Sequence, residues 1–483
     1  MTRVAAAKHR TLAWFRNDLR VRDNPALNWA RERGSVIAVY FAAPAQWSLH
    51  GMSANRRAFL LRTLAELSRS LARLNIPLLI RTVAWFDEQP AAIVNLARSH
   101  VADAVTYNDE YPLDEQRRDA ATFDRCRAVG IELRRFGGGV VLAPGQVLTG
   151  EGKPYTVFTP FRRRWLSIAD DGLLQPLDAP KRQTKIDVER DPIPKRIGGV
   201  AAGRLADLWP GGEAEAARRL DAFVARALRR YHEDRDRPDR DGTSRLSPYL
   251  AVGAISARQC IAAARQRERG TLDGSDIGAS TWISELIWRE FYAHVAAAFP
   301  DISRGRAFRP ANERVRWRDA PAEFVAWRDG RTGYPLVDAA MRQLAASGWM
   351  HNRLRMLTAM FLTKHLLIDW RLGERHFMDL LVDGDFAANN GGWQWSASTG
   401  TDAAPYFRVF NPVAQARKFD PDGAFVRRWV PELACIRGAA IFEPWRSGGA
   451  PGYPAPIVDH AVARQRALKA FTTRGRTVRH ANC

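Results

Sequence analysis

Residues 36–83 set the fold of the first third of the chain. Two apolar runs, VIAVYF (36–41) and PLLIRTV (77–83), flank an amphipathic run, NRRAFLLRTLAELSRSLARL (55–74). Short continuous apolar runs are typical of strands buried on both faces, and the run between them repeats its apolar residues at helical spacing. Thr11–Phe15 and Ala104–Tyr107 are two further short apolar runs of the same kind. We therefore predict a parallel α/β sheet that ends near Phe136.

The rest of the chain divides into a connector and a helical part. Prolines and charges recur between residues 144 and 210, which indicates a long linker over the surface. Beyond Gly211 the hydrophobic period becomes helical and stays so. We predict an α/β domain over residues 10–143, an interdomain linker over 144–210 and a large all-α domain over 211–475, with helices at Glu213–Tyr231, Ser256–Gln266, Ser280–Phe299, Pro335–Ser347, His351–His365 and Gly373–Leu381.

The predicted sheet lacks the local fingerprints of nucleotide binding. No G-x-G-x-x-G follows its first strand, and Gly145–Lys153 is not a P-loop because Glu151 stands where the lysine should follow the second glycine. The α/β domain therefore offers no dinucleotide motif of its own.

Composition narrows the class of protein. The 483 residues include 73 Lys and Arg against 52 Asp and Glu, a formal net charge of +21, and 46% are hydrophobic, which excludes global disorder. The positive surplus fits a polyanion partner such as nucleic acid, and equally a bias toward arginine as a solvated helix former. Eight of the sixteen tryptophans lie between Trp282 and Trp395, which suggests aromatic surfaces that face a planar ligand.

Cysteine usage and the absence of apolar spans indicate the compartment. Cys126, Cys260, Cys435 and Cys483 stand singly, which indicates neither a disulfide scaffold nor a zinc site. The basic N-terminus leads into no apolar segment, and no stretch of about 18 apolar residues follows. We expect a soluble cytoplasmic protein.

Three segments of the second half place polar groups where a ligand could bind them. Gly242–Ser247 (GTSRLS) precedes a helical segment, so it is either an ordinary helix cap or a phosphate site. Helical spacing places Trp282, Glu285 and Arg289 near one face; Glu285 either pairs with Arg289 in a tryptophan-rich core or bonds a ligand. Asn352, Arg355 and Met356 share a helical face that resembles a pocket wall.

The strongest local signal is Asp383–Trp395 (DGDFAANNGGWQW). It combines two carboxylates, two asparagines and three glycines before two tryptophans. Helix propensity is low here and polar groups are many, so we expect this run to approach a ligand closely.

These motifs resemble those of the photolyase/cryptochrome superfamily, and closely those of class I cyclobutane pyrimidine dimer (CPD) photolyases. The similarity extends from AWFRNDLR (13–20) to Pro431–Leu433 and includes residues 282–292, 348–356, 383–395 and 399–406. It implies a Rossmann-like N-terminal α/β domain that binds an antenna, a long linker and a helical catalytic domain that binds FAD. The implied enzyme flips a dimer out of UV-damaged DNA and splits it with an electron from photoexcited reduced FAD.

The resemblance assigns the flavin contacts residue by residue. A neutral amide at Asn389 would face flavin N5, where it suits an anionic reduced ring better than a carboxylate would. Arg355 would pair with Asp383. The full set of FAD-binding residues implied is Tyr231, Thr243, Ser244, Arg245, Leu246, Ser247, Trp282, Arg289, Trp349, Arg355, Asp383, Asp385 and Asn389.

The same resemblance assigns the lesion and DNA contacts. Glu285 would hydrogen-bond the thymine edge, and Trp288 and Trp395 would form aromatic walls. Asn352 and Met356 would contact the dimer; (6-4) photolyases carry histidines at both positions for proton transfer, so this pair points to cyclobutane dimers. Positions that match DNA contacts are Arg235, Arg353, Arg408 and Gln415.

A relay and an antenna complete the implied sites. Trp393, Trp370 and Trp317 match the family's chain of electron-relaying tryptophans, although each could be core by composition alone. His50, Asp114 and Glu115 match a folate antenna site. Asp114 replaces the family's asparagine, and Ser303-Arg304 replaces an expected Cys-Lys pair, so methenyltetrahydrofolate, a deazaflavin and an empty pocket all stay open.

Two alternatives are carried forward. A cryptochrome-type blue-light receptor would use the same fold, but the lesion residues are retained and the segment after Pro456 is short. A (6-4) photolyase would need the two histidines that are missing. We expect a monomer with damaged DNA as its partner, and no metal.

Overall fold

The computed structural model describes residues 9–267 and 276–473, so the expectation for Cys483 and the predicted domain end at residue 475 lie outside the described residues. The chain forms two compact units. Unit 1 comprises residues 1–155, 159–226 and 244–298, and unit 2 comprises 156–158, 227–243 and 299–483. This division differs from the boundaries expected at 143 and 210, because α8 (Glu213–Arg226), α10 (Ser247–Ala251), α11 (Ala257–Arg267) and α12 (Ile277–Ala298) pack with the first unit. The domain boundaries read from the sequence stay a prediction.

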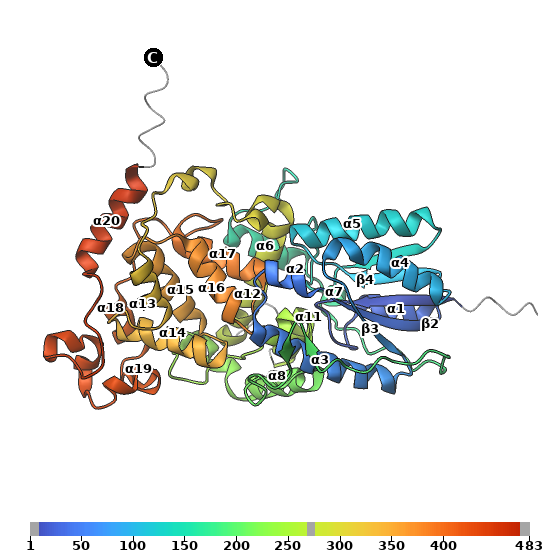
Figure 1. Ribbon diagram of the computed structural model, residues 1–483, viewed down its shortest axis with the longest axis horizontal. Helices are drawn as coiled ribbons and strands as arrows, with labels where there is room; N and C mark the ends of the chain where they lie inside the picture. Colours follow the sequence, from blue (N-terminus) through green and yellow to red (C-terminus); the bar gives the residue numbers. More distant parts are fainter. Residues whose placement is uncertain (1–8, 268–275, 474–483) are drawn as a thin grey trace, which may run out of the picture. The chain divides into compact units, whose positions relative to one another are not determined.

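Unit 1 contains the parallel sheet that the sequence predicts, and Figure 1 shows it. Its strands are β1 (Arg10–Phe15), β2 (Ser35–Ala42), β3 (Leu78–Thr82), β4 (Ala104–Asn108) and β5 (Glu132–Phe136), in the order β3-β2-β1-β4-β5. All four pairings are parallel. The strand order reverses between β1 and β4, and ligands of such sheets bind beyond the carboxyl ends of the strands at that point.

Alternate residues of each strand pack on opposite faces of the sheet, as the strand period requires. One face presents Leu12, Trp14, Val39 and Val105 to helices α4 (Gln89–Ser99) and α5 (Leu113–Ala128). Helix α1 (Pro25–Arg33) packs on β1 and β4, and α3 (Ala54–Arg73) on β3. The predicted helix over residues 55–74 is therefore confirmed within one residue at each end.

The segment predicted as a surface linker contains structure of its own. It includes α6 (Phe158–Ile168), α7 (Asp171–Leu174) and the small hairpin β6 (Arg196–Ile197) and β7 (Val200–Ala201). Phe161 and Trp165 of α6 are fully buried. Burial of these two aromatic side chains therefore stabilises a helix in a segment that is otherwise rich in prolines and charges. The remaining unit 1 helices are α2 (Pro44–Leu49), α8 (Glu213–Arg226), α10 (Ser247–Ala251), α11 (Ala257–Arg267) and α12 (Ile277–Ala298).

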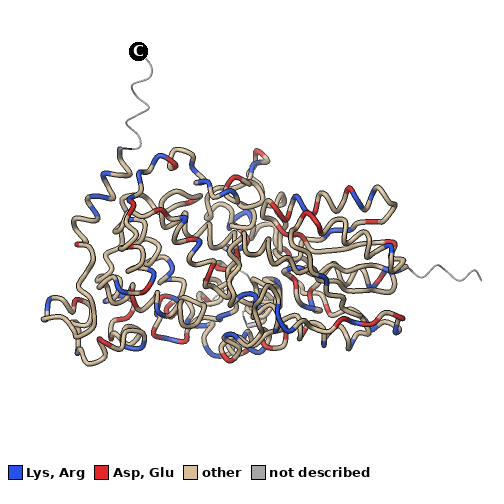
Figure 2. The backbone as a smooth tube through the Cα atoms, viewed as in Figure 1, with Lys and Arg blue, Asp and Glu red and all other residues tan. Residues whose placement is uncertain are grey.

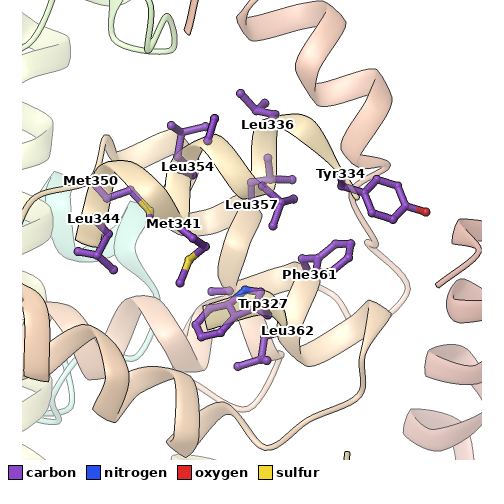
Figure 3. Packing of buried hydrophobic residues seen from close by; sticks show 14 of the residues in the cluster. Trp327, Tyr334, Leu336, Met341, Leu344, Met350, Leu354, Leu357, Phe361 and Leu362 are labelled. Atoms are coloured by element: carbon purple, nitrogen blue, oxygen red, sulfur yellow. The ribbon is translucent and has the colours of Figure 1, made fainter. Parts of the chain in front are cut away.

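Unit 2 is helical over its described residues. Its helices are α9 (Tyr231–Asp234), α13 (Pro321–Arg328), α14 (Pro335–Ser347), α15 (Asn352–Met360), α16 (Trp370–Leu380), α17 (Phe386–Ala397), α18 (Pro412–Phe419), α19 (Ala424–Trp429) and α20 (His460–Thr473). The predicted helix over 351–365 is α15 followed by a π-helical turn, Phe361–His365. Figure 3 shows the apolar core that α13, α14 and α15 share. Trp327, Leu344 and Leu357 belong to this core, one from each helix.

Helix α17 forms where the sequence has low helix propensity. The side chain of Asp385 caps it by accepting a hydrogen bond from the Ala388 backbone N–H at 2.9 Å. Packing against α16 supplies the rest, because Trp393 lies in the apolar core of unit 2. Tertiary burial thus overrides the cost of the Asn-Asn-Gly-Gly run.

Charges of both signs are spread along both units, as Figure 2 shows. Cys126 and Cys260 are buried, Cys435 is exposed, and all three are free thiols. No helix in the described ranges is long and apolar enough to span a bilayer.

Candidate functional site: a flavin and DNA site with a tryptophan relay

In unit 1, α12 places four predicted site residues on one helix. Trp282 is buried against Phe223, with ring centroids 4.8 Å apart. The Arg289 guanidinium donates to the backbone carbonyls of Gly139 (2.7 Å) and Leu250 (3.3 Å). Glu285 and Trp288 are partly exposed on the same helix. The arginine is therefore held rigidly, and the carboxylate and indole remain within reach of a ligand.

The predicted phosphate turn has an unusual backbone. Arg245 adopts φ +49°, a left-handed conformation that costs a non-glycine residue free energy and is concentrated at functional sites. At Gly242 a Cβ would lie 2.6 Å from Cβ of Asp234, so this close approach needs glycine. Thr243 ends one segment of unit 2, whereas Ser244–Ser247 belong to unit 1 and lead into α10.

The predicted pairing of Arg355 with Asp383 is present in unit 2. Arg355 Nη2 donates to Asp383 Oδ2 at 2.7 Å, and Arg355 Nε donates to the Met350 carbonyl at 2.9 Å. The second carboxylate oxygen, Asp383 Oδ1, is buried and has no hydrogen-bond partner within the described part of the chain. Because a buried acceptor without a donor is costly, this oxygen fits an N–H or O–H donor of a bound ligand such as FAD.

Asn389 is oriented by a residue that the sequence did not single out. Its Nδ2 donates to Glu374 Oε1 at 2.9 Å and to the Glu374 carbonyl at 3.1 Å. Both amide protons therefore point toward α16, which leaves Oδ1 free to accept from a ligand. Burial raises the pKa of Glu374 to about 7. Glu374 lies fifteen residues before Asn389 in a charged run, so no local pattern marks it.

The three predicted relay tryptophans belong to one apolar cluster of unit 2. Trp370 and Trp393 are buried within it, and Trp317 packs at its border, partly exposed. Gly373 lets α16 approach Trp393, because a Cβ there would lie 2.1 Å from the indole ring. Phe377 packs edge-on to Trp393, with centroids 4.9 Å apart. One face of α16 thus holds Trp370 and fixes Trp393.

Two of the predicted DNA contacts meet in unit 2. Arg353 donates to Asp236 Oδ1 through Nη2 (2.7 Å) and Nε (3.1 Å), and Arg235 Nε lies 4.0 Å from the same oxygen. The Arg353 guanidinium also lies over the Phe419 ring at 4.7 Å. Asp236 was not predicted; it stands in a run of alternating charges and keeps the two arginines together.

The other predicted contacts of unit 2 are accessible. Arg408 is exposed in a turn, and Gln415 is partly exposed on α18. Asn352 is exposed at the start of α15, and Met356, one turn later, is partly exposed beside Arg353. Trp395 is partly exposed, whereas Tyr231 and Trp349 are buried. The exposed residues can reach a ligand without any rearrangement of the core.

The three predicted antenna residues come together in unit 1. His50 Nε2 lies 3.0 Å from Asp114 Oδ2, and His50 Nδ1 lies 4.0 Å from Glu115 Oε1. Burial raises the pKa of Glu115, and its Oε2 is a buried acceptor that no group of residues 9–267 or 276–473 satisfies. The cluster therefore presents an open carboxyl group to a ligand that donates hydrogen bonds.

Comparison with known proteins identifies the family of this chain. The family pattern for DNA photolyase matches residues 11–181, and that for the FAD-binding domain of DNA photolyase matches residues 282–473. The chain is 46% identical over 466 residues to a deoxyribodipyrimidine photo-lyase of Salmonella typhimurium, covering 95% of this chain and 98% of that protein.

Two solved structures have the same fold. A bacterial class III photolyase from Agrobacterium tumefaciens is 37% identical, with a TM-score of 0.87 over 98% of this chain and 99% of that one. A Synechocystis cryptochrome is 29% identical, with a TM-score of 0.81 over 96% of this chain and 100% of that one.

An N-terminal parallel α/β sheet followed by a helical FAD-binding domain is the architecture of the photolyases and cryptochromes. Within that class, this chain belongs to the DNA photolyase family.

Proposed function

We propose that the protein is a light-dependent DNA repair enzyme, a carbon–carbon lyase that splits cyclobutane pyrimidine dimers. The observation that carries this choice of lesion is the pair Asn352 and Met356 on one face of α15. Neither side chain transfers a proton at neutral pH, and cyclobutane cleavage requires no proton transfer. The name of the Salmonella relative, deoxyribodipyrimidine photo-lyase, supports the same lesion.

FAD is the catalytic cofactor, and the residues present fit it. Bound and fully reduced, it would supply one electron to the dimer under light and recover it once the two bonds of the cyclobutane ring are broken. Asp383 Oδ1 would accept a hydrogen bond from the cofactor, and the side-chain carbonyl of Asn389 would accept one from the flavin ring. The other proposed FAD contacts are Tyr231, Thr243, Ser244, Arg245, Leu246, Ser247, Trp282, Arg289, Trp349, Arg355 and Asp385.

UV-damaged DNA is the proposed partner. Glu285 accepts from the thymine edge, and Trp288 and Trp395 pack against the flipped dinucleotide. Phosphates are held by Arg235, Arg353, Arg408 and Gln415, so binding depends on lesion structure and little on sequence. We further propose that the protein acts as a monomer in the cytoplasm.

The antenna proposal is a methenyltetrahydrofolate held by His50, Asp114 and Glu115. The open oxygen of Glu115 supports it, because a pterin ring presents N–H donors in a plane. A deazaflavin is the alternative. Release of the chromophore by denaturation and its absorption spectrum distinguish the two.

Lesion repair under blue light tests the function. The reduced, FAD-loaded protein is given two oligonucleotides, one with a cyclobutane thymine dimer and one with a (6-4) product, in light and in darkness. Light-dependent loss of the cyclobutane dimer alone is expected. Repair of the (6-4) product would reassign the lesion.

A cryptochrome-type receptor is the second candidate, because the Synechocystis cryptochrome shares the fold over nearly the whole chain. A flavin-loaded protein that changes redox state under light but repairs neither lesion would favour it.

A further inference from the structure

The C-terminal helix α20 contacts the end of the tryptophan relay. Phe471, near the end of α20, is 1% exposed and packs edge-on to Trp317, with ring centroids 6.0 Å apart. Val315 and Leu367 complete this small cluster. Trp317 itself keeps part of its surface exposed. The solvent-accessible part of the indole therefore lies beside α20.

Basic residues directly precede Trp317 in the chain and also lie along α20, the helix that contacts it. Helix α20 carries Arg464, Arg466 and Lys469 and no acidic residue, which Figure 2 shows along the helix. Arg314 and Arg316 precede Trp317 and are exposed. Across residues 9–267 and 276–473, neither of these two arginines nor Arg464 forms an ion pair.

Several charges close to Trp317 in the fold are compensated. Arg318 is paired with Glu323 at 2.7 Å, and Arg371 is paired with Glu313 at 2.7 Å and with Asp369 at 3.2 Å. Among the described residues without an ion pair, Arg314, Arg316 and Arg464 outnumber the exposed acid Asp319, so the balance on this side of the molecule is positive. Such a field raises the local concentration of anions and the rate at which they arrive.

A buried lysine anchors the inner side of α20. Lys364 is 0% exposed; its Nζ donates to Ser398 Oγ at 2.8 Å and lies 3.5 Å from the centroid of Phe471. Arg466 Nη2 donates to the His365 carbonyl at 2.5 Å. These contacts fix α20 and its basic residues on the π-helical turn Phe361–His365.

We propose that Trp317, once oxidised, is re-reduced by a small anionic one-electron donor that docks on the basic surface formed by Arg314, Arg316, Arg464 and Lys469. The inference rests on the proposed function and on an electron relay of Trp393, Trp370 and Trp317, which we propose as part of it. In the relay, Trp317 loses one electron toward Trp370 and Trp393, and its radical cation loses the indole proton to water. The donor anion then gives one electron, a proton returns from water to the indole nitrogen, and the donor leaves as its own one-electron oxidation product.

Transient absorption after a light flash tests the donor's charge. The FAD-loaded protein is followed through decay of the tryptophan radical with ascorbate monoanion as donor, and separately with neutral 4-methoxyphenol. With ascorbate, the bimolecular rate constant is expected to fall with rising salt and to be about three- to tenfold lower in Arg464→Glu and in Arg316→Glu. With 4-methoxyphenol, both variants should match the original protein.

Control variants separate charge at this surface from net charge and from folding. Arg125→Glu makes the same charge change on exposed α5 and should leave both donors unaffected. Arg464→Lys should retain the ascorbate rate. Equal slowing by Arg125→Glu, or no salt dependence with ascorbate, would overturn the proposal.

The same experiment distinguishes failure of the inference from failure of the proposed function. Absence of any tryptophan radical in the original protein would remove the relay itself. A radical whose decay ignores the donor's charge would remove only the inference. An Arg464→Glu variant that loses affinity for DNA with unchanged donor kinetics would also overturn it and assign the charge to DNA.

Discussion

At the scale of single residues, the hydrogen bond between Asn389 and Glu374 decides how the amide faces its ligand. Asn389 was predicted from the sequence, but its orientation was not, because the partner lies on another helix. The carboxyl of Glu374 is buried and its pKa is raised to about 7, with burial as the main cause. Near neutral pH this group therefore changes charge directly behind the amide.

We predict that Glu374 makes stability fall as pH rises. A folded-state pKa above the unfolded value near 4.5 means that the protonated form stabilises the fold, fully below about pH 4.5, and that this contribution is lost up to about pH 7. Melting temperatures of the original protein and of Glu374→Gln, which keeps the oxygen acceptor for Asn389, measure it between pH 5 and 8. The original protein should lose stability relative to the variant over this range; parallel curves would contradict the assignment.

Gly373 gives a second residue-scale prediction. A methyl group there would meet the Trp393 ring at 2.1 Å, so Gly373→Ala should cost about 1–3 kcal/mol of unfolding free energy and reduce flavin photoreduction. Thermal and denaturant unfolding give the stability. Gly150→Ala is the matched control, because nothing lies within 4 Å of its Cβ position, and it should change stability little. Equal stability of the two variants would mean that the ring yields to the methyl group.

At the scale of elements, Glu290 of α12 explains why part of the predicted linker is buried. Its carboxylate accepts from the backbone N–H groups of Val141 and Leu142, each at 2.8 Å, and from Trp165 Nε1 at 2.6 Å. One side chain thus holds both the segment after the sheet and α6 on α12. No local sequence pattern marks Glu290, because its three donors come from distant positions in the chain.

We predict that removing this acceptor destabilises unit 1. Glu290→Leu leaves three buried donors unpaired and should cost at least about 3 kcal/mol, whereas Trp165→Phe removes one donor and should cost about 1 kcal/mol beyond the change in packing. Denaturant unfolding of the two variants measures the loss of unfolding free energy in each, and the two losses are compared. A Glu290→Leu cost no larger than that of Trp165→Phe would show that the segment finds other acceptors.

Element boundaries were predictable where the periodicity was strong. The predicted and observed bounds of α14 agree at Pro335–Ser347, and four of the five strands follow from apolar runs. For β5 (ELRRF) only the end of the sheet near Phe136 was predicted, because its charged residues form no apolar run. Helix α17 was not expected, because its stability comes from a cap and from packing on α16 that local propensity does not contain. The candidate site divides in the same way: residue types were predictable, and the partners that orient them, Glu374 and Asp236, were not.

At the scale of the whole molecule, the relay offers a test that separates photoreduction from repair. Trp317→Phe should reduce photoreduction of oxidised flavin by at least about tenfold, since phenylalanine is far harder to oxidise, and should leave repair by chemically reduced protein unchanged. Visible absorption under illumination measures the first, and dimer loss the second. Trp29→Phe on α1 is the control for a lost indole. Unchanged photoreduction in Trp317→Phe would remove this residue from the relay.

The order of residues within the two units has a consequence for synthesis on the ribosome. Unit 1 needs residues up to 298 before its last helix, α12, can close over Glu290's partners, and residues 227–243 of unit 2 emerge before most of that unit exists. The sheet can therefore form early, while the apolar faces of α3, α8 and α11 stay exposed until their packing partners are synthesised. Nascent chains that end between about residues 226 and 298 should consequently depend most on chaperones. If the chain is divided at residue 211, both resulting fragments should be insoluble.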